Sequence, residues 1–320
     1  MSKPVLVLAG PTASGKSGLA LAIAEAMTGV VINADSMQVY RELAVLTARP
    51  GAAALARAPH RLYGMLPADE PCSAGGWRKM ALGEIAAAHA TGRLAIVTGG
   101  SGLYIQALVE GIVALPEVPR EIRESARALF EKLGAEGFHA ALAARDPVMA
   151  GRLRPRDRQR LIRAWEVLET TGESLAALQE ERSEGPPAHL DFVGILLEPP
   201  RGELYAAIER RLDAMIAAGA IAEVASLLAL GLDPRLPAMK AVGVPELASY
   251  LHGELSLEAA VRRAKQATRR LAKRQLTWFR HHRPGREILI VKDAPFAQLS
   301  ESFKERIFNF IRQNLLTEAH

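Results

Sequence analysis

The sequence predicts an α/β fold in which a parallel-sheet core carries a mainly helical insertion. Short apolar runs at 3–9, 30–32 and 94–98 have the length and character of fully buried strands. Such strands, alternating with helix-like stretches, favour a parallel sheet. Proline-containing breaks at 115–119 and 184–187 bracket a segment with the pattern of helices alone. We therefore expect that segment to be inserted into the α/β core.

Composition restricts the class of protein. The chain has 320 residues, 40 Lys+Arg against 35 Asp+Glu, and 49% hydrophobic residues, which excludes disordered, collagen-like and disulfide-scaffold chains. Cys72 is the single cysteine, so no internal disulfide or cysteine-based zinc site can form, and a cytoplasmic location is expected. No apolar run approaches the roughly 18 to 20 residues of a membrane helix, and the N-terminus does not resemble a signal peptide. We therefore expect no membrane contact.

The strand at 3–9 leads into the glycine-rich sequence GPTASGKS at 10–17, and a helix is expected at 18–27. This is the phosphate-loop (P-loop) motif G-x-x-x-x-G-K-[ST] in its required strand–loop–helix setting. It predicts a phosphate or diphosphate ligand, of which a nucleotide such as ATP is one kind.

Each position of this loop has a physical purpose. Gly10 and Gly15 let the backbone turn its N–H groups around phosphate oxygens, and the helix N-terminus adds its positive end. Lys16 supplies a mobile positive charge, and Ser17 offers a hydroxyl to Mg²⁺, the expected cofactor. The residues expected to bind the diphosphate here are Gly10, Pro11, Thr12, Ala13, Ser14, Gly15, Lys16 and Ser17.

The second strand, at 30–32, leads into NADSMQVYR at 33–41. Ligands of open parallel sheets bind beyond the carboxyl ends of the strands, so Asp35 is expected to point toward the ligand of the loop. A carboxylate there holds Mg²⁺ or acts as a general base. The alternative is an Asp that caps a following short helix.

The third strand, at 94–98, ends in GGSGLY at 99–104. P-loop NTPases usually place a Mg²⁺-organising Asp at the end of such a strand, whereas Thr98 and glycines stand here. Ordinary ATP hydrolysis is therefore not the expected reaction. Ser101 either hydrogen-bonds a ligand or caps the following helix.

Positive charge is concentrated in two segments. Residues 259–286 hold ten basic side chains and no acid, so the formal charge of +5 leaves 5 − 10 = −5 for the remainder. A second cluster, six arginines, lies at 152–163. A single basic run is typically a solvated helix face. Two basic segments on a chain that is otherwise acidic indicate instead that the protein binds a polyanion. Trp278 and Phe279 suit stacking on bases or packing in the core; because they are adjacent, a helix can bury only one fully.

The chain is expected to divide into a discontinuous core, 1–115 and 190–320, and a helical insertion, 116–189, that contacts the polyanion. Within the second part of the core, the pattern predicts a buried strand at 192–197, helices at 203–218, 221–230 and 257–280, a short strand at 287–292 and an amphipathic helix at 298–316.

Taken together, the motifs resemble the tRNA dimethylallyltransferase family, also called the tRNA isopentenyltransferase or IPP transferase family, in its bacterial form. The resemblance covers nearly the whole chain. It rests on GPTASGKS at 10–17, DSMQVYR at 35–41, TARP at 47–50, HRL at 60–62, GGSGLY at 99–104, RQRLIRA at 158–164, KAVGVPE at 240–246 and TRRLAKRQLTWFR at 268–280.

The resemblance implies a P-loop NTPase-like core and an enzyme that transfers a dimethylallyl group from dimethylallyl diphosphate to N6 of the adenosine 3′ of the anticodon, in tRNAs reading codons that begin with U. The implied partners are this diphosphate and the anticodon stem-loop of tRNA, and we expect a monomer. Asp35 is implied as general base, Ser101 as a group that positions the acceptor, and Lys16 as a stabiliser of the leaving diphosphate. Arg211 matches an additional diphosphate-binding arginine, with Arg210 beside it as the alternative.

The implied tRNA contacts are Asp35, Ser36, Met37, Gln38, Ser101, Arg123, Gln159, Arg160, Leu161, Ile162, Arg163, Lys240, Ala241, Val242, Gly243, Val244, Pro245, Lys273, Arg274, Gln275, Leu276, Thr277, Trp278, Phe279 and Arg280. The sequence departs from the family pattern at 46–50, usually G-T-A-K-P, and at 242–245, usually V-G-Y-R/K. Without its aromatic ring and cation, the second loop offers less to an RNA.

Two other functions stay open. A P-loop small-molecule kinase that uses ATP shares the loop but gives no reason for the basic segment at 259–286. A non-catalytic RNA-binding protein with a nucleotide switch explains the basic clusters but leaves Asp35 without a purpose. Labelled dimethylallyl diphosphate distinguishes them, because only a transferase moves its label into tRNA.

Overall fold

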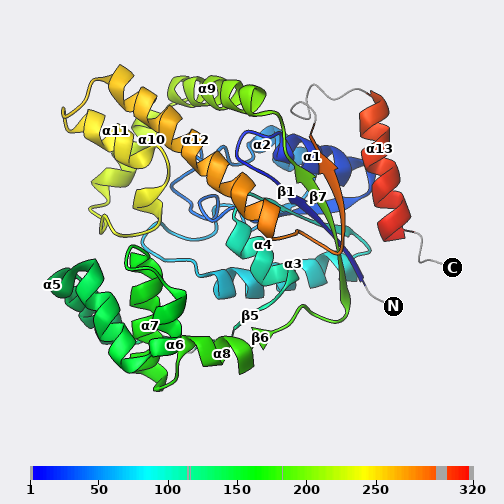
Figure 1. The fold of residues 1–320 in the computed structure, drawn as a ribbon. Helices are drawn as coiled ribbons and strands as arrows, with labels where there is room; N and C mark the ends of the chain where they lie inside the picture. The colour runs from blue at the N-terminus through cyan, green and yellow to red at the C-terminus, as the bar shows by residue number, and fades with distance from the viewer. Residues whose placement is uncertain (1–2, 114, 116, 182, 293–300, 317–320) are drawn as a thin grey trace. The chain divides into compact units, whose positions relative to one another are not determined.

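The computed structural model describes residues 3–113, 115, 117–181, 183–292 and 301–316 (Figure 1). The chain divides into two compact units, one formed by Met1–Glu110 with Pro186–His320 and the other by Gly111–Gly185. The first is called the core unit below and the second the insertion unit. Their limits lie within five residues of those expected from the sequence.

The core unit is built on a six-stranded sheet in which every pairing is parallel. The strand order is β3-β2-β4-β1-β7-β8, so the first strand lies inside the sheet with its neighbours drawn from distant parts of the chain. The strands are β1 (Lys3–Ala9), β2 (Gly29–Asn33), β3 (His60–Arg61), β4 (Leu94–Gly99), β7 (Leu190–Leu197) and β8 (Glu287–Val291).

Alternate residues of β1 belong to two separate hydrophobic clusters. Val5, Val7 and Ala9 pack on one face of the sheet, and Leu6 and Leu8 pack on the other. Since both faces are covered, the strand sequence is apolar throughout, as expected for a central parallel strand. This arrangement confirms the predicted α/β class.

Helices cover both faces, as Figure 1 shows. The cluster that contains Leu6 includes residues of α1 (Lys16–Ala26), beside which α2 (Ala52–Arg57) packs, and of α13 (Glu301–Ile311). The opposite cluster includes residues of α3 (Ala74–Ala90), α4 (Gly102–Val109), α9 (Arg201–Ala217), α10 (Ala220–Ala229), a 3₁₀ turn η1 (Ala238–Lys240), α11 (Val244–Leu251) and α12 (Leu257–His281).

The insertion unit is helical, as predicted, and has its own hydrophobic cluster. Aromatic rings lie at its centre, with Phe138 packed 5.1 Å from Phe130 and 5.3 Å from Trp165 between ring centroids. Gly134 breaks the first helix with φ +69°. Its elements are α5 (Arg120–Arg145), α6 (Pro147–Arg152), α7 (Arg158–Thr171), α8 (Leu175–Glu181) and an antiparallel pair, β5 (Ile112–Val113) and β6 (Ser183–Glu184).

Most predicted elements are found within a few residues of their expected ends. The helix expected at 298–316 is α13, followed by a π-helical turn at Arg312–Leu316, and residues 298–300 lie outside the described part of the chain. No helix follows Asp35 directly, because the chain between Ser36 and Pro50 forms turns. The alternative in which Asp35 caps a short helix is therefore wrong.

Within the described residues, no single helix has the length and apolar character needed to cross a membrane. One pair, α9 and α10, passes the same test on length and composition, although the two helices are bent by 65° from each other.

Candidate active site

Three loops meet where the strands β1, β2 and β4 end. The ladder between β2 and β4 continues past the strands, since Ala34 N donates to Thr98 O at 2.7 Å and Ser101 N donates to Ala34 O at 3.1 Å. A Cβ on Gly99 would overlap the backbone of Ala34, so only glycine permits this approach. The loop after β2 is thereby held against the loop after β4.

The P-loop has the backbone conformation that its glycines permit. Gly10 has φ +151°, and a Cβ there would lie 2.7 Å from the carbonyl oxygen of Leu197 in β7. Gly15 has φ +88° and is the N-cap of α1. The loop therefore passes close to the sheet and presents the N-terminus of α1 beyond it, which is the arrangement that binds phosphate.

Lys16 lies in a partly buried, charged environment. Its Nζ donates to the carbonyl oxygen of Pro11 at 2.5 Å. Burial of the ammonium lowers the pKa of Lys16 to about 7, with the carboxylate of Asp35 opposing the shift and the guanidinium of Arg211 adding to it. Burial likewise lowers the pKa of Arg211, while Asp35 raises it. The three charged groups therefore interact electrostatically, and they come from β1–α1, the β2 loop and α9.

Asp35 is fixed by a buried asparagine that the sequence analysis did not single out. Asn33 Oδ1 accepts from Asp35 N at 2.8 Å, and its Nδ2 donates to Asp35 O and to Leu62 O, each at 3.0 Å. One carboxylate oxygen of Asp35 accepts from Met37 N at 2.9 Å. The second oxygen has no hydrogen bond to any described residue. A polar residue directly after the apolar run at 30–32 was the feature of the sequence that could have indicated this role. In the structure Asn33 is fully buried.

Ser101 orients the same loop rather than capping a helix through its side chain. It is the N-cap residue of α4 without a side-chain capping bond. Its Oγ accepts from Ser36 N at 2.8 Å and donates to Ser36 Oγ at 3.1 Å. Of the two possibilities left open by the sequence, side-chain capping is thus wrong, and the hydroxyl lies beside the Asp35 loop.

Gln275 connects the basic helix α12 to two of these loops. Its Oε1 accepts from Thr12 N in the P-loop at 2.8 Å, and its Nε2 donates to Gly100 O at 2.9 Å. A Cβ on Gly100 would collide with this amide. Gln275 is buried and both ends of its amide are used, so its side chain joins the P-loop to the loop that follows β4.

Arg211 and its neighbour are clearly distinguished. Arg211 is partly buried, interacts with Lys16 and Asp35, and donates from Nη2 to Thr47 O at 3.4 Å. Arg210 is exposed. The geometry thus favours Arg211 as the residue that faces the P-loop.

The basic side chains of α12 fall into two groups. On the side toward α9, Lys265 pairs with Asp213 at 2.8 Å and Arg269 with Glu209 at 2.7 Å. Arg280 lies 3.3 Å from Glu198, at the end of β7. The other cations on the helix form no ion pair within the described part of the chain; they are Arg262, Arg263, Arg270, Lys273 and Arg274.

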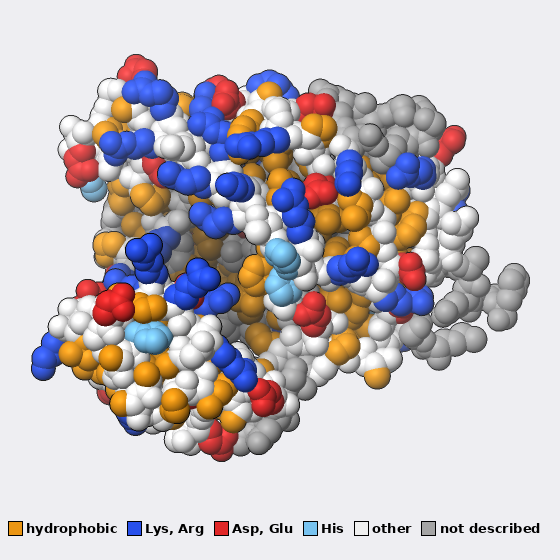
Figure 2. All heavy atoms as spheres, viewed as in Figure 1, with side chains coloured by type: hydrophobic (Ala, Val, Ile, Leu, Met, Phe, Trp, Pro, Cys, Tyr) orange, Lys and Arg blue, Asp and Glu red, His pale blue; other side chains and the backbone are white. Residues whose placement is uncertain are grey.

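The unpaired group lies over an exposed surface of the core unit. Figure 2 shows Lys and Arg side chains gathered along the course of α12. A surface pocket of about 350 Å³ lies between α11 and α12, with Arg263, Gln266 and Arg270 on one side and Pro245 and Ser249 on the other. Glu246 also lines this pocket, but the five cations form no ion pair with described residues, so the surface keeps a net positive charge that suits a polyanion.

The two aromatic residues of α12 have different environments. Phe279 is buried in the core, whereas Trp278 is half-buried, as the prediction that only one could be fully buried requires. Trp278 lies against Gly102, where a Cβ would overlap its ring, and stacks on His282 with centroids 4.5 Å apart. Its Nε1 is enclosed without a hydrogen-bond partner in the described structure.

Several residues expected to contact tRNA have side chains inside the protein. Their side chains pack within the protein in this structure, and their implied contacts with tRNA stay predictions. In the core unit and the insertion unit they are Leu161, Ile162, Ala241, Val244, Gln275 and Phe279. The others of that set are at least partly exposed, except Gly243.

The arginine cluster of the insertion unit is partly neutralised. Three arginines pair with acids inside this unit: Arg152 with Glu180, Arg158 with Glu131, and Arg163 with Glu166. Arg154, Arg156 and Arg160 are exposed and form no ion pair with described residues. Arg123 lies 3.8 Å from Glu117.

The donor set at the P-loop suits a hydrated divalent cation. No group of three or more His, Cys, Asp or Glu side chains lies close enough to hold a metal ion, within the described residues. Near the loop are the exposed Ser17 hydroxyl and the Asp35 carboxylate. Mg²⁺ typically keeps several waters and uses one or two protein ligands with phosphate oxygens. These residues therefore fit Mg²⁺ bound together with a diphosphate.

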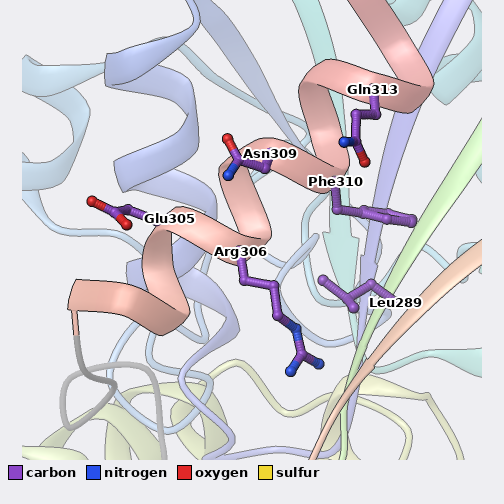
Figure 3. A pocket seen from close by; sticks show the side chains of 6 residues that line it. All are labelled: Leu289, Glu305, Arg306, Asn309, Phe310 and Gln313. Carbon is purple, nitrogen blue, oxygen red and sulfur yellow. The ribbon is translucent and has the colours of Figure 1, made fainter.

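A second surface pocket, of about 430 Å³, lies between β8 and α13 (Figure 3). Its walls combine Leu289 and Phe310 with polar side chains, including Glu305 and Asn309. None of the residues predicted from the sequence to take part in function lines it.

Comparisons with known proteins agree with this geometry. The sequence model of the family described as IPP transferase matches residues 38–282. A tRNA dimethylallyltransferase from Rhodospirillum centenum is 56% identical over 280 residues, which is 88% of this chain and 89% of that protein. One from Paramagnetospirillum magneticum is 51% identical over 99% of this chain and 98% of its own.

Solved structures give the same result. The full-length tRNA isopentenylpyrophosphate transferase of Bacillus halodurans superposes with a TM-score of 0.70 at 31% identity, covering 99% of this chain and 98% of its own. A eukaryotic dimethylallyltransferase acting on tRNA gives a TM-score of 0.82 over 98% of this chain and 80% of its own; at 24% identity it supports the fold alone.

Proposed function

The chain belongs to the IPP transferase family of prenyl-transferring enzymes, and from this premise we propose that it transfers a dimethylallyl group from dimethylallyl diphosphate to N6 of the adenosine 3′ of the anticodon, in tRNAs reading codons that begin with U. The products are N6-(dimethylallyl)adenosine and diphosphate. The observation that carries this proposal is the cluster of Lys16, Asp35 and Arg211 at the strand ends, joined through Gln275 to a basic helix.

The P-loop binds the diphosphate. Lys16, Arg211 and the N–H groups at the start of α1 face the oxygens that gain negative charge as the bond between the allylic carbon and diphosphate breaks. Ser14 Oγ, buried and without a partner in the described structure, is available to a phosphate oxygen. Ser17 would hold Mg²⁺, which when bound supplies further charge stabilisation to the leaving group.

Asp35 accepts the proton from N6. As diphosphate departs, the allylic carbon gains positive character and the amine nitrogen forms the new bond to it. The proton that this nitrogen must lose goes to the carboxylate oxygen of Asp35 that has no hydrogen bond to described residues, while the other is held by Met37 N. Ser36 and Ser101, hydrogen-bonded to each other, position the acceptor beside this carboxylate.

The tRNA is held through its phosphates. The unpaired cations of α12, with Lys240 and Arg280, suit contacts with the RNA backbone. Trp278 lies against Gly102, the residue after Ser101, where its ring can pack on a base. Arg123, Gln159, Arg160 and Arg163 supply contacts from the insertion unit. The adenine must leave the anticodon-loop stack, at a cost of roughly a few kcal/mol.

Incubation with radiolabelled dimethylallyl diphosphate, Mg²⁺ and unmodified tRNA tests the proposal. Label is expected in tRNA, at the adenosine 3′ of the anticodon. Movement of the γ-phosphate of ATP without prenylation would instead support the kinase alternative, which the family relationship does not favour. We also propose that the enzyme works as a cytoplasmic monomer, which sedimentation at assay concentration tests.

A further inference from the structure

An acidic residue outside the strand-end loops is used entirely on backbone N–H groups. Glu223, in α10, accepts from Ala44 N at 2.6 Å and Val45 N at 2.7 Å through Oε1, and from Leu46 N at 2.9 Å through Oε2. Three consecutive N–H groups converging on one carboxylate form a strong, charge-assisted anchor. It fixes a segment that lies almost 180 positions away in the sequence.

The anchored segment leads directly to the site. Thr47 follows it, and its carbonyl oxygen accepts from Gln38 Nε2 at 2.8 Å and from Arg211 Nη2 at 3.4 Å. The Thr47 hydroxyl is itself used, donating to Leu43 O at 2.6 Å. The Thr47 carbonyl therefore holds both Gln38, in the Asp35 loop, and Arg211. The position of this carbonyl depends in turn on residues 44–46, which Glu223 anchors.

We propose that Glu223 is a positioning residue for the donor site: it fixes the Thr47 carbonyl and, through it, directs Arg211 toward the diphosphate. This inference rests on the proposed function, since it assigns Arg211 to that ligand. A glutamine at 223 has one acceptor oxygen in place of two and presents an NH₂ group to N–H donors, so it cannot satisfy the three backbone groups.

The first test compares Glu223→Gln with Glu203→Gln. Both remove one negative charge, but Glu203 is exposed in the first turn of the adjacent helix α9. For Glu223→Gln the KM for dimethylallyl diphosphate is expected to rise about tenfold, with a smaller change in the dissociation constant of tRNA measured without donor. For Glu203→Gln both are expected to stay near wild-type. Circular dichroism and Tm establish that each variant is folded.

A double-mutant cycle with Arg211→Ala separates positioning through Arg211 from general destabilisation. If Glu223 acts through Arg211, the Glu223→Gln substitution adds little to the donor KM once Arg211 is absent. Full additivity would overturn the inference, because the effect would then not pass through Arg211. If Arg211→Ala alone leaves the donor KM unchanged, the assignment of Arg211 in the proposed function fails instead. A conservative Glu223→Asp variant, which keeps the charge, is expected to recover part of the lost donor affinity.

Discussion

The strand-end loops and the outer surface of α12 both use charge, but in different physical settings. At the loops, Lys16, Asp35 and Arg211 are few, partly buried, and close enough that the charge of Asp35 affects the pKa of both Lys16 and Arg211. Along α12 the cations are many, and those without an acidic partner are exposed. Enclosed charges interact strongly and each substitution alters its neighbours, whereas exposed charges are screened by salt and act nearly independently. The loops are therefore suited to chemistry, and the helix surface to holding a large polyanion.

The largest effect is expected at Asp35. Asp35→Asn keeps an acceptor for Met37 N and so preserves the loop, but it removes the base. Turnover is expected to fall by about 10² to 10⁴-fold, while the dissociation constant of tRNA changes little. Single-turnover rates and filter binding measure the two quantities. A wild-type rate in this variant would show that Asp35 is not the general base. The strand-end loops would then not be distinguished from α12 by a catalytic carboxylate.

The Lys16 ammonium should give the loops a dependence on pH that α12 lacks. Because burial lowers the pKa of Lys16 to about 7, the free enzyme loses this charge as the pH rises above 7, and binding the diphosphate then requires uptake of a proton. The donor KM is expected to increase with pH, by up to about tenfold per unit between pH 7 and 9. In Lys16→Arg the guanidinium stays protonated, so the rise should disappear even if the overall KM is higher. An identical rise in both proteins would assign the dependence to another group.

Gln275 joins the two regions, and its removal should affect the loops more than the RNA surface. Gln275→Leu leaves Thr12 N and Gly100 O without their partner, at about 1–3 kcal/mol for each buried group. We expect a lower Tm and a severalfold higher donor KM, with tRNA affinity reduced less. Gln266→Leu, the same change on an exposed part of α12, is the matched control and should leave the donor KM unchanged. Equal donor KM values in the two variants would show that α12 does not position the P-loop.

Features encoded by local pattern were predictable from the sequence. The buried strands, the P-loop and the position of Asp35 after β2 depend on runs of neighbouring residues, and each was found as predicted. The long helix α3 was not predicted, because Gly75 and Gly76 stand in its first turn and obscure its start. The two-residue strand β3 is too short to have a pattern at all.

Features that depend on distant partners could not be read from the sequence. In the sequence, nothing distinguishes Glu223 from other acidic residues of amphipathic helices. Its role depends on contacts with residues 44–46, which only the structure shows. Gln275 lies within a basic motif whose pattern predicts contact with RNA, and nothing in that pattern indicates its two hydrogen bonds to the backbone of Thr12 and Gly100. The same limit applies to the arginines, since only tertiary contacts decide which are neutralised by acids.

That last distinction leads to the smallest expected effect, on the salt dependence of tRNA binding. Arg270 has no acidic partner among the described residues, so Arg270→Gln should weaken tRNA binding a few-fold and reduce the slope of log K against log salt by about one. Arg269 is already paired with Glu209. Removing that pair together, as Arg269→Gln with Glu209→Gln, keeps the net charge and should leave the slope unchanged. The donor KM should stay constant in both variants, because the charges of this surface are screened from the strand-end loops.

If the neutral pair substitution lowers the slope as much as Arg270→Gln does, the ion pairs of α12 open on RNA binding. The division of the α12 cations into paired and RNA-facing groups then does not hold.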